Sequence, residues 1–434
     1  MMRNFVNKRI EKLKYEIREI VLVAKEVEKL GQKITWENIG DPVEKGEKVA
    51  DWIKKIVQGA AKKNLSYAYS PTKGLDMTRE FLANLVNKRG KTKISKENIL
   101  FFNGLGDAIN KVYGCLDKSA RIIMPSPGYP AHFSQEAIQA GKEPIFYNLD
   151  PKNNWYPNLK DLAQKIKKHP EIVGILIINP NNPTGICWPK KYLVEILKLA
   201  KRNGFFIVAD EIYINMVFGK EKVISLSDIV GNLPAISMKG ISKEFPWPGS
   251  RCGWLEFYNL NKDKNFKRYF ETIFKSKMVE VCSTSLPQFV IPKIIRSPRY
   301  KKTLQERLRK YKEKSDILVK VFKDSKEIIL VKPDSAFYAT IVFKDGVLNG
   351  KQKLEIKNKK IRNLTEKKVN GKIPLDRRFA YYLLGQSGIC VVPLTGFYSK
   401  YFGFRMTLLE PDFKKFEFIC QKIRGKIKEY LESA

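Results

Sequence analysis

Apolar residues recur at two different spacings along this chain, and each spacing predicts a different kind of element. One helix face at the amino end carries Leu13, Ile17, Ile20, Val21, Ala24, Val27 and Leu30, with Gly31 following as a C-terminal cap. Further helices are predicted at residues 51–61, 77–88, 159–168, 190–202, 267–278, 297–323 and 411–431, and one more begins near 103–107. Short apolar runs bounded by Gly, Pro or Asn predict strands. These runs are 34–37, 98–102, 121–124, 144–148, 174–178, 205–209, 235–238, 253–257, 328–331, 337–343 and 388–392.

Strands and helices alternate through the middle of the chain, which predicts an α/β fold. Such alternation gives a mostly parallel sheet with helices on both faces, and ligands bind beyond the carboxyl ends of its strands. A chain of 434 residues exceeds what one hydrophobic core usually supports. We expect an N-terminal helix and part of a smaller domain in residues 1–48, a large domain in 49–296, and a smaller α+β domain in 297–434. Within it, residues 344–378 hold twelve basic and four acidic residues, and we expect a surface insertion of unknown role.

The chain is strongly basic. Lys and Arg together number 81 against 45 Asp and Glu, which gives a formal net charge of +36. Such a charge attracts anions, which fits nucleic acid, an acidic membrane surface, or a phosphorylated cofactor with dicarboxylate substrates. The cations are spread along amphipathic helices, where lysine usually forms the solvated face, so charge alone selects none of the three.

Cysteine and histidine usage argues against several other classes. The six cysteines stand singly, and the two histidines, His132 and His169, are isolated. These spacings fit neither a zinc site nor a His-based catalytic triad, so we expect both histidines to be structural. The first residues lack the apolar core of a signal peptide, and no apolar run is long enough to cross a membrane. A cytoplasmic protein without membrane contact is expected.

Polar side chains follow three of the predicted strands at the points where these strands end. Asn182 lies in NPNNPTG at 179–185, Asp210 and Tyr213 lie in DEIY at 210–213, and Lys243 follows the strand at 235–238. Because the carboxyl ends of parallel strands share one edge of a sheet, these four side chains should converge. Each alone has a structural explanation, such as a turn or cap role for Asn182 and Asp210 or an ordinary surface position for Lys243, but together they indicate a binding site.

The residue types at this edge suit pyridoxal phosphate. Lys243 lies in an apolar stretch punctuated by Gly and Pro, and burial favours the uncharged amine that condenses with an aldehyde. Arg251, eight residues later, offers a fork-shaped cation for a phosphate. Asp210 can keep a pyridine nitrogen protonated, while Asn182 and Tyr213 can donate to the phenolate oxygen.

Three further features fit the same ligand and an amino-acid substrate. Tyr129 follows the strand at 121–124 and is placed to stack on an aromatic ring. The turn at 103–107 joins a strand to a helix, which presents backbone amides to a phosphate. Arg405 is a lone arginine in an apolar run, which favours a role in binding a substrate carboxylate.

In their order along the chain, these motifs resemble the class I/II aminotransferases, which are fold type I pyridoxal-phosphate enzymes. The resemblance rests on NPNNPTG at 179–185, DEIY at 210–213, and SK at 242–243 with PGSR at 248–251, and it spans nearly the whole chain. The segments YEIR at 15–18, NIGDP at 38–42, KGISK at 239–243, GICVVP at 388–393 and FRMT at 404–407 look most like the alanine aminotransferases of archaea and eukaryotes.

The resemblance implies a role for each residue. It implies that Lys243 holds the cofactor covalently and then moves a proton between the substrate Cα and the cofactor, and that Asp210 pairs with the pyridine nitrogen. The other implied contacts are Asn182 and Tyr213 to the phenolate oxygen, Arg251 with the backbone of Leu105 and Gly106 to the phosphate, Tyr129 to the ring face, and Gly40 with Arg405 to the substrate carboxylate. Tyr69 is implied to reach the phosphate of a neighbouring subunit, which implies a homodimer.

The chain departs from the family at one cofactor position. Many relatives carry a serine three residues before the lysine as a phosphate ligand, whereas this chain has Gly240 there. Ser242 and Ser237 are the two candidates to replace it. The basic run at 344–378 has no recognised counterpart.

The resulting interpretation is a ping-pong transaminase that moves the amino group of L-alanine, or a similar amino acid, to 2-oxoglutarate. Aspartate, a broad or aromatic substrate range, and lyase chemistry on the same fold stay open, because the cofactor residues do not separate them. A pyridoxal-phosphate-binding regulator or nucleic-acid-binding protein is the alternative of a different class. About forty residues precede NIGDP and leave little room for a DNA-binding module, so nucleic acid is not expected as a partner.

Overall fold

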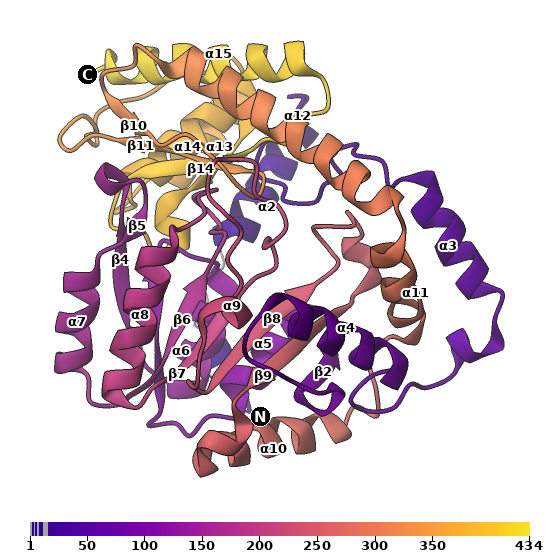
Figure 1. Cartoon of the computed structure of the whole chain (residues 1–434). Helices are drawn as coiled ribbons and strands as arrows, with labels where there is room; N and C mark the ends of the chain where they lie inside the picture. Colours follow the sequence, from indigo (N-terminus) through magenta and orange to yellow (C-terminus); the bar gives the residue numbers. More distant parts are fainter. Residues whose placement is uncertain (1, 4, 7, 12–15) are drawn as a thin grey trace.

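An eight-stranded sheet with the order β2-β9-β8-β7-β6-β3-β4-β5 forms the centre of the molecule (Figure 1). The computed structural model describes residues 2–3, 5–6, 8–11 and 16–434. The strands from β8 through β7, β6 and β3 to β4 are parallel, while β2, β9 and β5 are antiparallel to their neighbours. The strands are β2 (Ile99–Phe102), β3 (Arg121–Ser126), β4 (Phe146–Asp150), β5 (Tyr156–Pro157), β6 (Ile172–Ile178), β7 (Phe206–Asp210), β8 (Ala235–Gly240) and β9 (Gly253–Tyr258). The expected α/β fold with a mostly parallel sheet is confirmed.

Helices cover both faces of this sheet, because alternate strand residues point to two separate apolar cores. Helices α5 (Leu105–Gly114), α6 (Pro130–Ala140) and α10 (Lys264–Met278) pack on one face. On the other lie α3 (Asp51–Ala61), α4 (Asp76–Arg89), α7 (Leu159–Lys168), α8 (Lys190–Asn203), α9 (Leu226–Ile229) and α11 (Ser285–Arg296). Gly204, in the left-handed conformation with φ +68°, ends α8 and turns the chain into β7.

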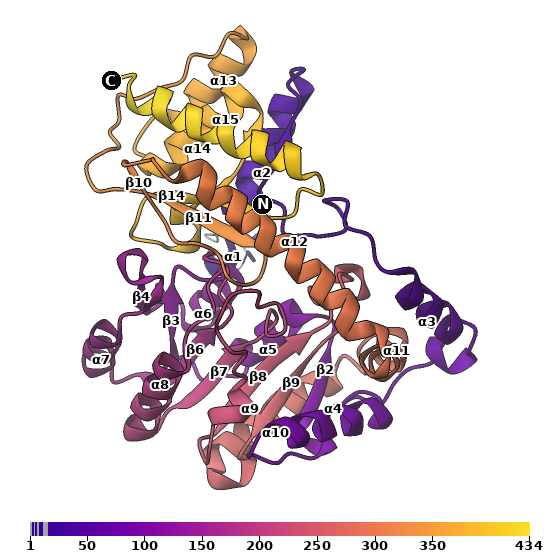
Figure 2. The same ribbon diagram turned by 45° about the horizontal axis from the view of Figure 1, so that its top comes forward.

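A smaller antiparallel sheet with the order β10-β11-β14-β13 lies beyond the carboxyl ends of the large one (Figure 2). Its strands are β10 (Ile328–Leu330), β11 (Tyr338–Phe343), β13 (Val392–Pro393) and β14 (Gly403–Thr407). The helices packed around it are α2 (Glu16–Lys29), α12 (Arg299–Phe322), α13 (Lys359–Val369), α14 (Leu375–Ser387) and α15 (Phe413–Leu431). A separate two-stranded ladder joins β1 (Thr35–Trp36) to β12 (Ile389–Cys390), and α1 (Lys8–Glu11) lies against α6.

The sequence pattern misses six of the described helices, of which α1 and α9 span only four residues each. It misses α6, whose first residue is Pro130, and α11, which contains Pro292 within its apolar run. It also misses α13 and α14, which lie wholly or partly inside the basic segment 344–378. The strand predicted at 388–392 is divided between β12 and β13, which belong to different sheets. The part of the first predicted helix that contains Leu13, and Tyr15 of YEIR, lie outside the described residues.

The basic segment 344–378 is more than a surface insertion, which corrects that expectation. Leu354, Ile356 and Ile361 are buried in the core of the smaller sheet, while the lysines between them face outward. Sparse apolar residues separated by lysines look superficial in the sequence, but here they anchor the segment. Among the described residues, no helix is both long and apolar enough to cross a membrane.

Candidate active site

The carboxyl ends of β6, β7 and β8 lie level with one another, and they bring the predicted residues together. Asp210, the last residue of β7, pairs in register with Ile178 of β6 and Met238 of β8. Asn182 lies in the loop that follows β6, and Lys243 lies in the loop that follows β8. The sequence-based expectation that these loops share one edge therefore matches the sheet register.

Lys243 points its amine at the amino-terminal segment of the chain. Its Nζ donates a hydrogen bond to the carbonyl oxygen of Gly40 at 2.7 Å and lies 5.6 Å from the ring centroid of Phe337. Phe337 directly precedes β11 of the smaller sheet. The amine thus lies where the large sheet, the smaller sheet and the segment after β1 meet.

Asp210 is buried and is held by a histidine. Its Oδ2 lies 3.1 Å from Nε2 of His132, and its Oδ1 accepts the backbone N–H of Ile212 at 3.1 Å. Nδ1 of His132 lies 3.0 Å from the hydroxyl of Tyr113 on α5. This arrangement fixes the carboxylate and keeps a basic group behind it.

Arg405 is 3% exposed and lies on β14, within the smaller sheet. Its Nη1 donates to Oδ1 of Asn182 at 3.1 Å, and its Nη2 donates to the carbonyl oxygen of Asn38 at 2.6 Å. The guanidinium also lies over the rings of Tyr338 and Phe397, 4.4 and 4.9 Å from their centroids. A buried guanidinium clamped in this way is oriented for a carboxylate ligand.

Tyr213 and Tyr338 form a buried pair beside Gly40. The hydroxyl of Tyr213 donates to that of Tyr338 at 3.1 Å, and burial together with Tyr338 raises the pKa of Tyr213 well above its usual value. A Cβ atom on Gly40 would overlap the hydroxyl of Tyr338. Only glycine therefore lets this segment approach the tyrosine.

Groups that can donate hydrogen bonds to an anion lie at the amino terminus of α5. Gly104, at φ +83°, precedes the helix, so the N–H groups of Leu105 and Gly106 lie in its first turn. A Cβ added to Gly104 would lie 2.6 Å from Nη2 of Arg251, so the guanidinium lies directly against this turn. The buried hydroxyl of Ser250 has no hydrogen-bond partner among the described residues. The N–H groups of the first turn and the guanidinium of Arg251 are therefore grouped here, and Ser250 directly precedes that arginine in the chain.

The serines that could compensate for Gly240 differ in their surroundings. Ser237 is fully buried in β8, and its hydroxyl donates to the carboxylate of Glu211. This hydroxyl therefore has a structural partner within the large sheet. Ser242 is half-buried and directly precedes Lys243. Ser250, which the sequence reading did not select, has the unsatisfied hydroxyl.

These geometric features agree with the comparisons to known proteins. The sequence profile of "Aminotransferase class I and II" matches residues 34–421. This chain belongs to the class I and II aminotransferases. It is 51% identical over 433 residues to an uncharacterised aminotransferase of Methanocaldococcus jannaschii, with both chains covered in full. It is 30% identical over 285 residues to the glutamate-pyruvate aminotransferase of Escherichia coli. The aligned region covers 65% of this chain and 69% of the other.

Solved structures support the same family. An alanine aminotransferase of Pyrococcus furiosus superposes with a TM-score of 0.82 at 26% identity, covering 99% of this chain and 100% of the other. The predicted membership of class I/II, and with it the dependence on pyridoxal phosphate, is confirmed.

The residues of this aminotransferase fit its cofactor. The orphaned hydroxyl of Ser250 and the Gly104 turn against Arg251 suit a phosphate, and the supported carboxylate of Asp210 suits a protonated pyridine nitrogen. Tyr129 is half-buried at the start of α6, with its ring edge-on to His132 at 6.3 Å. Among the described residues, no group of three or more His, Cys, Asp or Glu could hold a metal ion.

Tyr69 does not join this cluster of buried groups. Its side chain is 83% exposed in the segment before α4. Within one chain it therefore lacks the buried surroundings of the other predicted residues, which is compatible with a role toward a second subunit.

Sequence reasoning missed His132 and Tyr338 as site residues. His132 was expected to be structural, but it contacts Asp210 from α6, the helix that the pattern did not predict. Tyr338 looks like one more apolar strand residue. A usable signal for His132 is its position three residues after Tyr129, which places both on one helix face.

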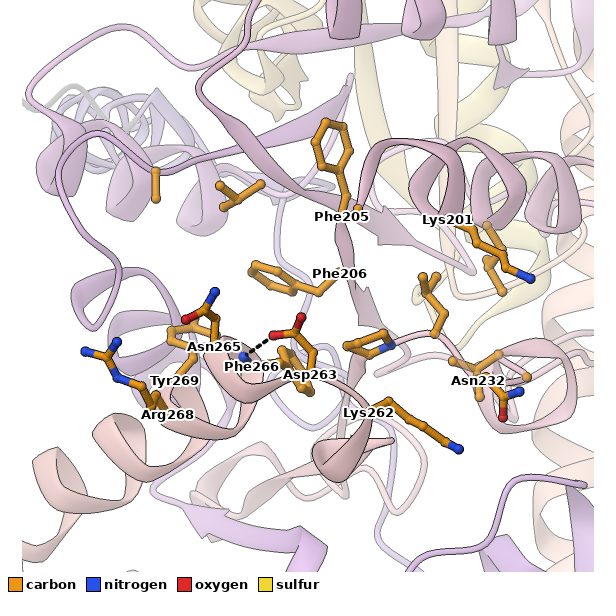
Figure 3. Close-up of a pocket in the computed structure, with 18 of the residues that line it drawn as sticks. Lys201, Phe205, Phe206, Asn232, Lys262, Asp263, Asn265, Phe266, Arg268 and Tyr269 are labelled. Atoms are coloured by element: carbon orange, nitrogen blue, oxygen red, sulfur yellow. Dashed lines mark hydrogen bonds between the residues drawn. The ribbon is translucent and has the colours of Figure 1, made fainter.

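A large cavity elsewhere in the enzyme is separate from this site. Its volume is about 1080 Å³, and it lies at the amino ends of the parallel strands, near Phe205, Phe206 and Pro234 (Figure 3). Phe266 of α10 and Lys201 of α8 also line it, and the carboxylate of Asp263 caps α10 there (Figure 3). None of the predicted site residues lines this cavity.

Proposed function

We propose that this aminotransferase moves the amino group of L-alanine, or of a similar amino acid, to 2-oxoglutarate in two successive half-reactions. One observation supports the active-site assignment above all. The carbonyls of Asn38 and Gly40, two residues apart, hold the guanidinium of Arg405 and the amine of Lys243. An amino acid whose carboxylate binds Arg405 then presents its Cα toward the lysine.

Each side chain has a defined task in this proposal. Pyridoxal phosphate supplies the aldehyde that takes up the amino group and the ring that withdraws electrons from Cα. Lys243 binds the cofactor between turnovers, and its free amine accepts the proton from Cα and returns it. Asp210, supported by His132, keeps a negative charge beside the pyridine nitrogen. Arg405 orients the substrate through its carboxylate.

The remaining contacts hold the cofactor in place. Arg251, the first turn of α5 at Leu105 and Gly106, and a serine hydroxyl bind the phosphate. Asn182 and Tyr213 donate to the phenolate oxygen, and Tyr129 packs on the ring. Asn182 already contacts Arg405 at 3.1 Å, so the cofactor-binding and substrate-binding groups are mechanically linked.

The choice of alanine is supported by the similar proteins. The relatives include a glutamate-pyruvate aminotransferase, and the solved structures include an alanine aminotransferase. The 2-oxo acid partner is a dicarboxylate, which suits the strongly positive chain. Aspartate and aromatic amino acids are the alternative donors that a substrate series must separate.

We also propose a homodimer in which Tyr69 reaches the neighbouring site. Large apolar side chains are exposed at Leu65, Tyr67, Val279 and Val281 as well as at Tyr69. The two segments lie side by side, because Ser285 donates to the carbonyl of Ala68 at 2.7 Å and Ser70 to that of Ser283 at 3.2 Å. Exposed large apolar side chains on two adjacent segments are typical of a subunit interface.

A cytoplasmic location completes the proposal. All six cysteines are free, and four of them are buried as ordinary apolar side chains. Unpaired thiols are the usual state in a reducing compartment.

A steady-state substrate series tests the proposal. The purified protein with pyridoxal phosphate is given 2-oxoglutarate and one donor at a time from L-alanine, L-aspartate, L-tyrosine and L-phenylalanine, and glutamate is quantified. We expect the highest kcat/KM with alanine and parallel lines in double-reciprocal plots. A clear preference for aspartate or for an aromatic donor would replace the alanine assignment while keeping the transaminase.

A further inference from the structure

Arg307 of α12 is a buried arginine that contacts the main chain of the proposed catalytic lysine. It is 8% exposed. Its Nη2 donates to the carbonyl oxygen of Lys243 at 3.1 Å, and its Nη1 donates to that of Glu244. Both carbonyls lie in the loop between β8 and β9, and no backbone N–H of the described residues bonds to either. The arginine thus supplies the donors that regular secondary structure supplies elsewhere.

The same guanidinium also holds the segment that carries Gly40. Its Nε pairs with Oε1 of Glu47, and its Nη2 lies 3.4 Å from Oε2 of that residue. The hydroxyl of Tyr311, one turn further along α12, donates to Oε2 of Glu47 at 2.6 Å and accepts from Nη2 at 3.2 Å. Glu47 follows Gly40 by seven residues. The ion pair between Arg307 and Glu47 therefore also fixes the segment whose Gly40 carbonyl accepts from the Lys243 amine.

Helix α12 connects the two halves of the molecule. It packs on α11 beside the large sheet and on α15 beside the smaller one, and it crosses the space between them (Figures 1 and 2). Arg307 therefore joins three parts at one point: the loop of Lys243, the segment that includes Gly40, and the helix that links the sheets.

We propose that Arg307 is a positioning residue that fixes the amine of Lys243 relative to the substrate-binding segment. The proposal rests on the proposed function of Lys243. Arg307 touches no reacting atom; it acts through the carbonyls of Lys243 and Glu244 and through Glu47. A guanidinium has five donors in a rigid plane, so it can serve all three partners at once, whereas a lysine has a single donor atom.

The expected consequence is a loss of rate rather than of substrate affinity. A displacement of about 1 Å of a catalytic group can cost about 100-fold in rate. Arg307→Ala should therefore lower kcat per bound cofactor by about 10- to 100-fold. The KM for the amino acid should change by less than about threefold, because Arg405 and its partners are untouched.

Arg309→Ala is the matched control. Arg309 lies on the same helix, but its side chain is 72% exposed, and it pairs only loosely with Glu313 at 3.7 Å. Arg307→Lys and Glu47→Gln serve as milder variants in case the alanine variant does not fold. Both keep much of the volume and remove part of the network, so each should lower kcat by a smaller factor than Arg307→Ala.

A second readout does not depend on turnover. Hydrogen exchange is followed by mass spectrometry in the peptide covering residues 241–247 of the full-length protein without added cofactor. We expect this peptide to exchange about tenfold faster in Arg307→Ala or Arg307→Lys than in wild type or Arg309→Ala. Unchanged exchange in the Arg307 variants, or a kcat per bound cofactor equal to that of Arg309→Ala, would overturn the positioning role.

The two readouts separate the possible failures. If the wild-type protein shows no transamination but the loop still loosens in the Arg307 variants, the proposed function fails and the structural clamp stands. If wild type transaminates and the Arg307 variants match the control in both readouts, only the positioning role fails.

Discussion

Lys243 and Arg405 are held by the same short segment of chain, although one follows β8 of the large sheet and the other lies in β14 of the small one. The amine donates to the carbonyl of Gly40 at 2.7 Å, and the guanidinium donates to that of Asn38 at 2.6 Å. The residues 38–40 therefore position both the amine that would move a proton and the guanidinium that would bind the carboxylate. A change in this segment should displace both groups.

Gly40→Ala tests whether the segment 38–40 positions Lys243 and Arg405. The added methyl group would overlap the hydroxyl of Tyr338, which contacts Tyr213 at 3.1 Å, so the tyrosine or the segment must move. We expect kcat/KM for the amino acid to fall by about 10- to 100-fold, while the dissociation constant of pyridoxal phosphate changes little. The pair Gly40→Ala with Tyr338→Phe should recover part of the loss. Full activity in the single variant would contradict the close approach seen in the structure.

Arg405→Lys should weaken substrate binding more than cofactor binding. A lysine cannot reproduce the bidentate pairing with a carboxylate, nor can it contact Asn182 and Asn38 together. We expect kcat/KM to fall by about 100-fold or more for the amino acid and for the 2-oxo acid alike, since both would use this arginine. Steady-state kinetics with each substrate measures this fall in kcat/KM. A loss confined to one of the two substrates would show that a different cation binds the other carboxylate.

His132→Phe probes the support of Asp210. Phenylalanine keeps most of the ring volume but removes the 3.1 Å contact to Oδ2 of Asp210. We expect pyridoxal phosphate to bind about tenfold more weakly and kcat to fall by a similar factor, because a buried carboxylate loses a hydrogen-bonding partner. Tyr113→Phe, which removes only the outer contact of the histidine, should have a smaller effect in a fluorescence titration. Equal behaviour of both variants and wild type would make His132 a packing residue, as the sequence alone suggests.

Lys314 gives a pH dependence of stability. It is 3% exposed on α12, its Nζ donates to the carbonyl of Leu408 at 3.2 Å, and burial lowers its pKa to about 8. In the unfolded chain the pKa returns to its ordinary value near 10.5, so the unfolded state binds more protons between these two pH values. The free energy of unfolding should therefore gain up to about 3 kcal/mol from this lysine as pH rises from 8 to 10.5.

Lys314→Met isolates that contribution. Denaturant unfolding at pH 7.5 and about pH 10 should show a smaller gain with pH in the variant than in wild type, because other groups titrate equally in both. Lys302→Met, at an exposed position of the same helix, should keep the wild-type slope. Identical slopes for Lys314→Met and wild type would contradict a buried, easily deprotonated amine.

Part of the site could be predicted because it depends on strand order alone. Asn182, Asp210 and Lys243 follow parallel strands, and parallel strands end at one edge whatever packs around them. Arg405 stands out in the sequence because an arginine in an apolar run is costly to bury without an anion. These four residues can therefore be predicted as site residues without knowing which side chains surround them in the fold.

The residues that sequence reasoning missed act through contacts with distant elements. His132 matters because α6 packs against the end of β7, and Arg307 matters because α12 crosses from one sheet to the other. Neither contact can be identified from the sequence, because Arg307 looks like an ordinary helix residue and the spacing of His132 from Tyr129 does not identify Asp210 as its partner. The burial of Leu354 and Ile356 within a basic segment has the same cause, because tertiary packing decides which sparse apolar residues form a core.

In the proposed function, Lys243 binds pyridoxal phosphate and carries out both half-reactions. The most direct test is the visible absorption spectrum of the protein with pyridoxal phosphate, recorded before and after L-alanine and then after 2-oxoglutarate, with Lys243→Ala as the comparison. We predict that wild type shows the band of the lysine-bound cofactor, loses it with alanine, and regains it with 2-oxoglutarate. The variant should stay folded and show neither that band nor turnover. A wild-type protein without the band, or a Lys243→Ala variant that still transaminates at the normal rate, would contradict the account.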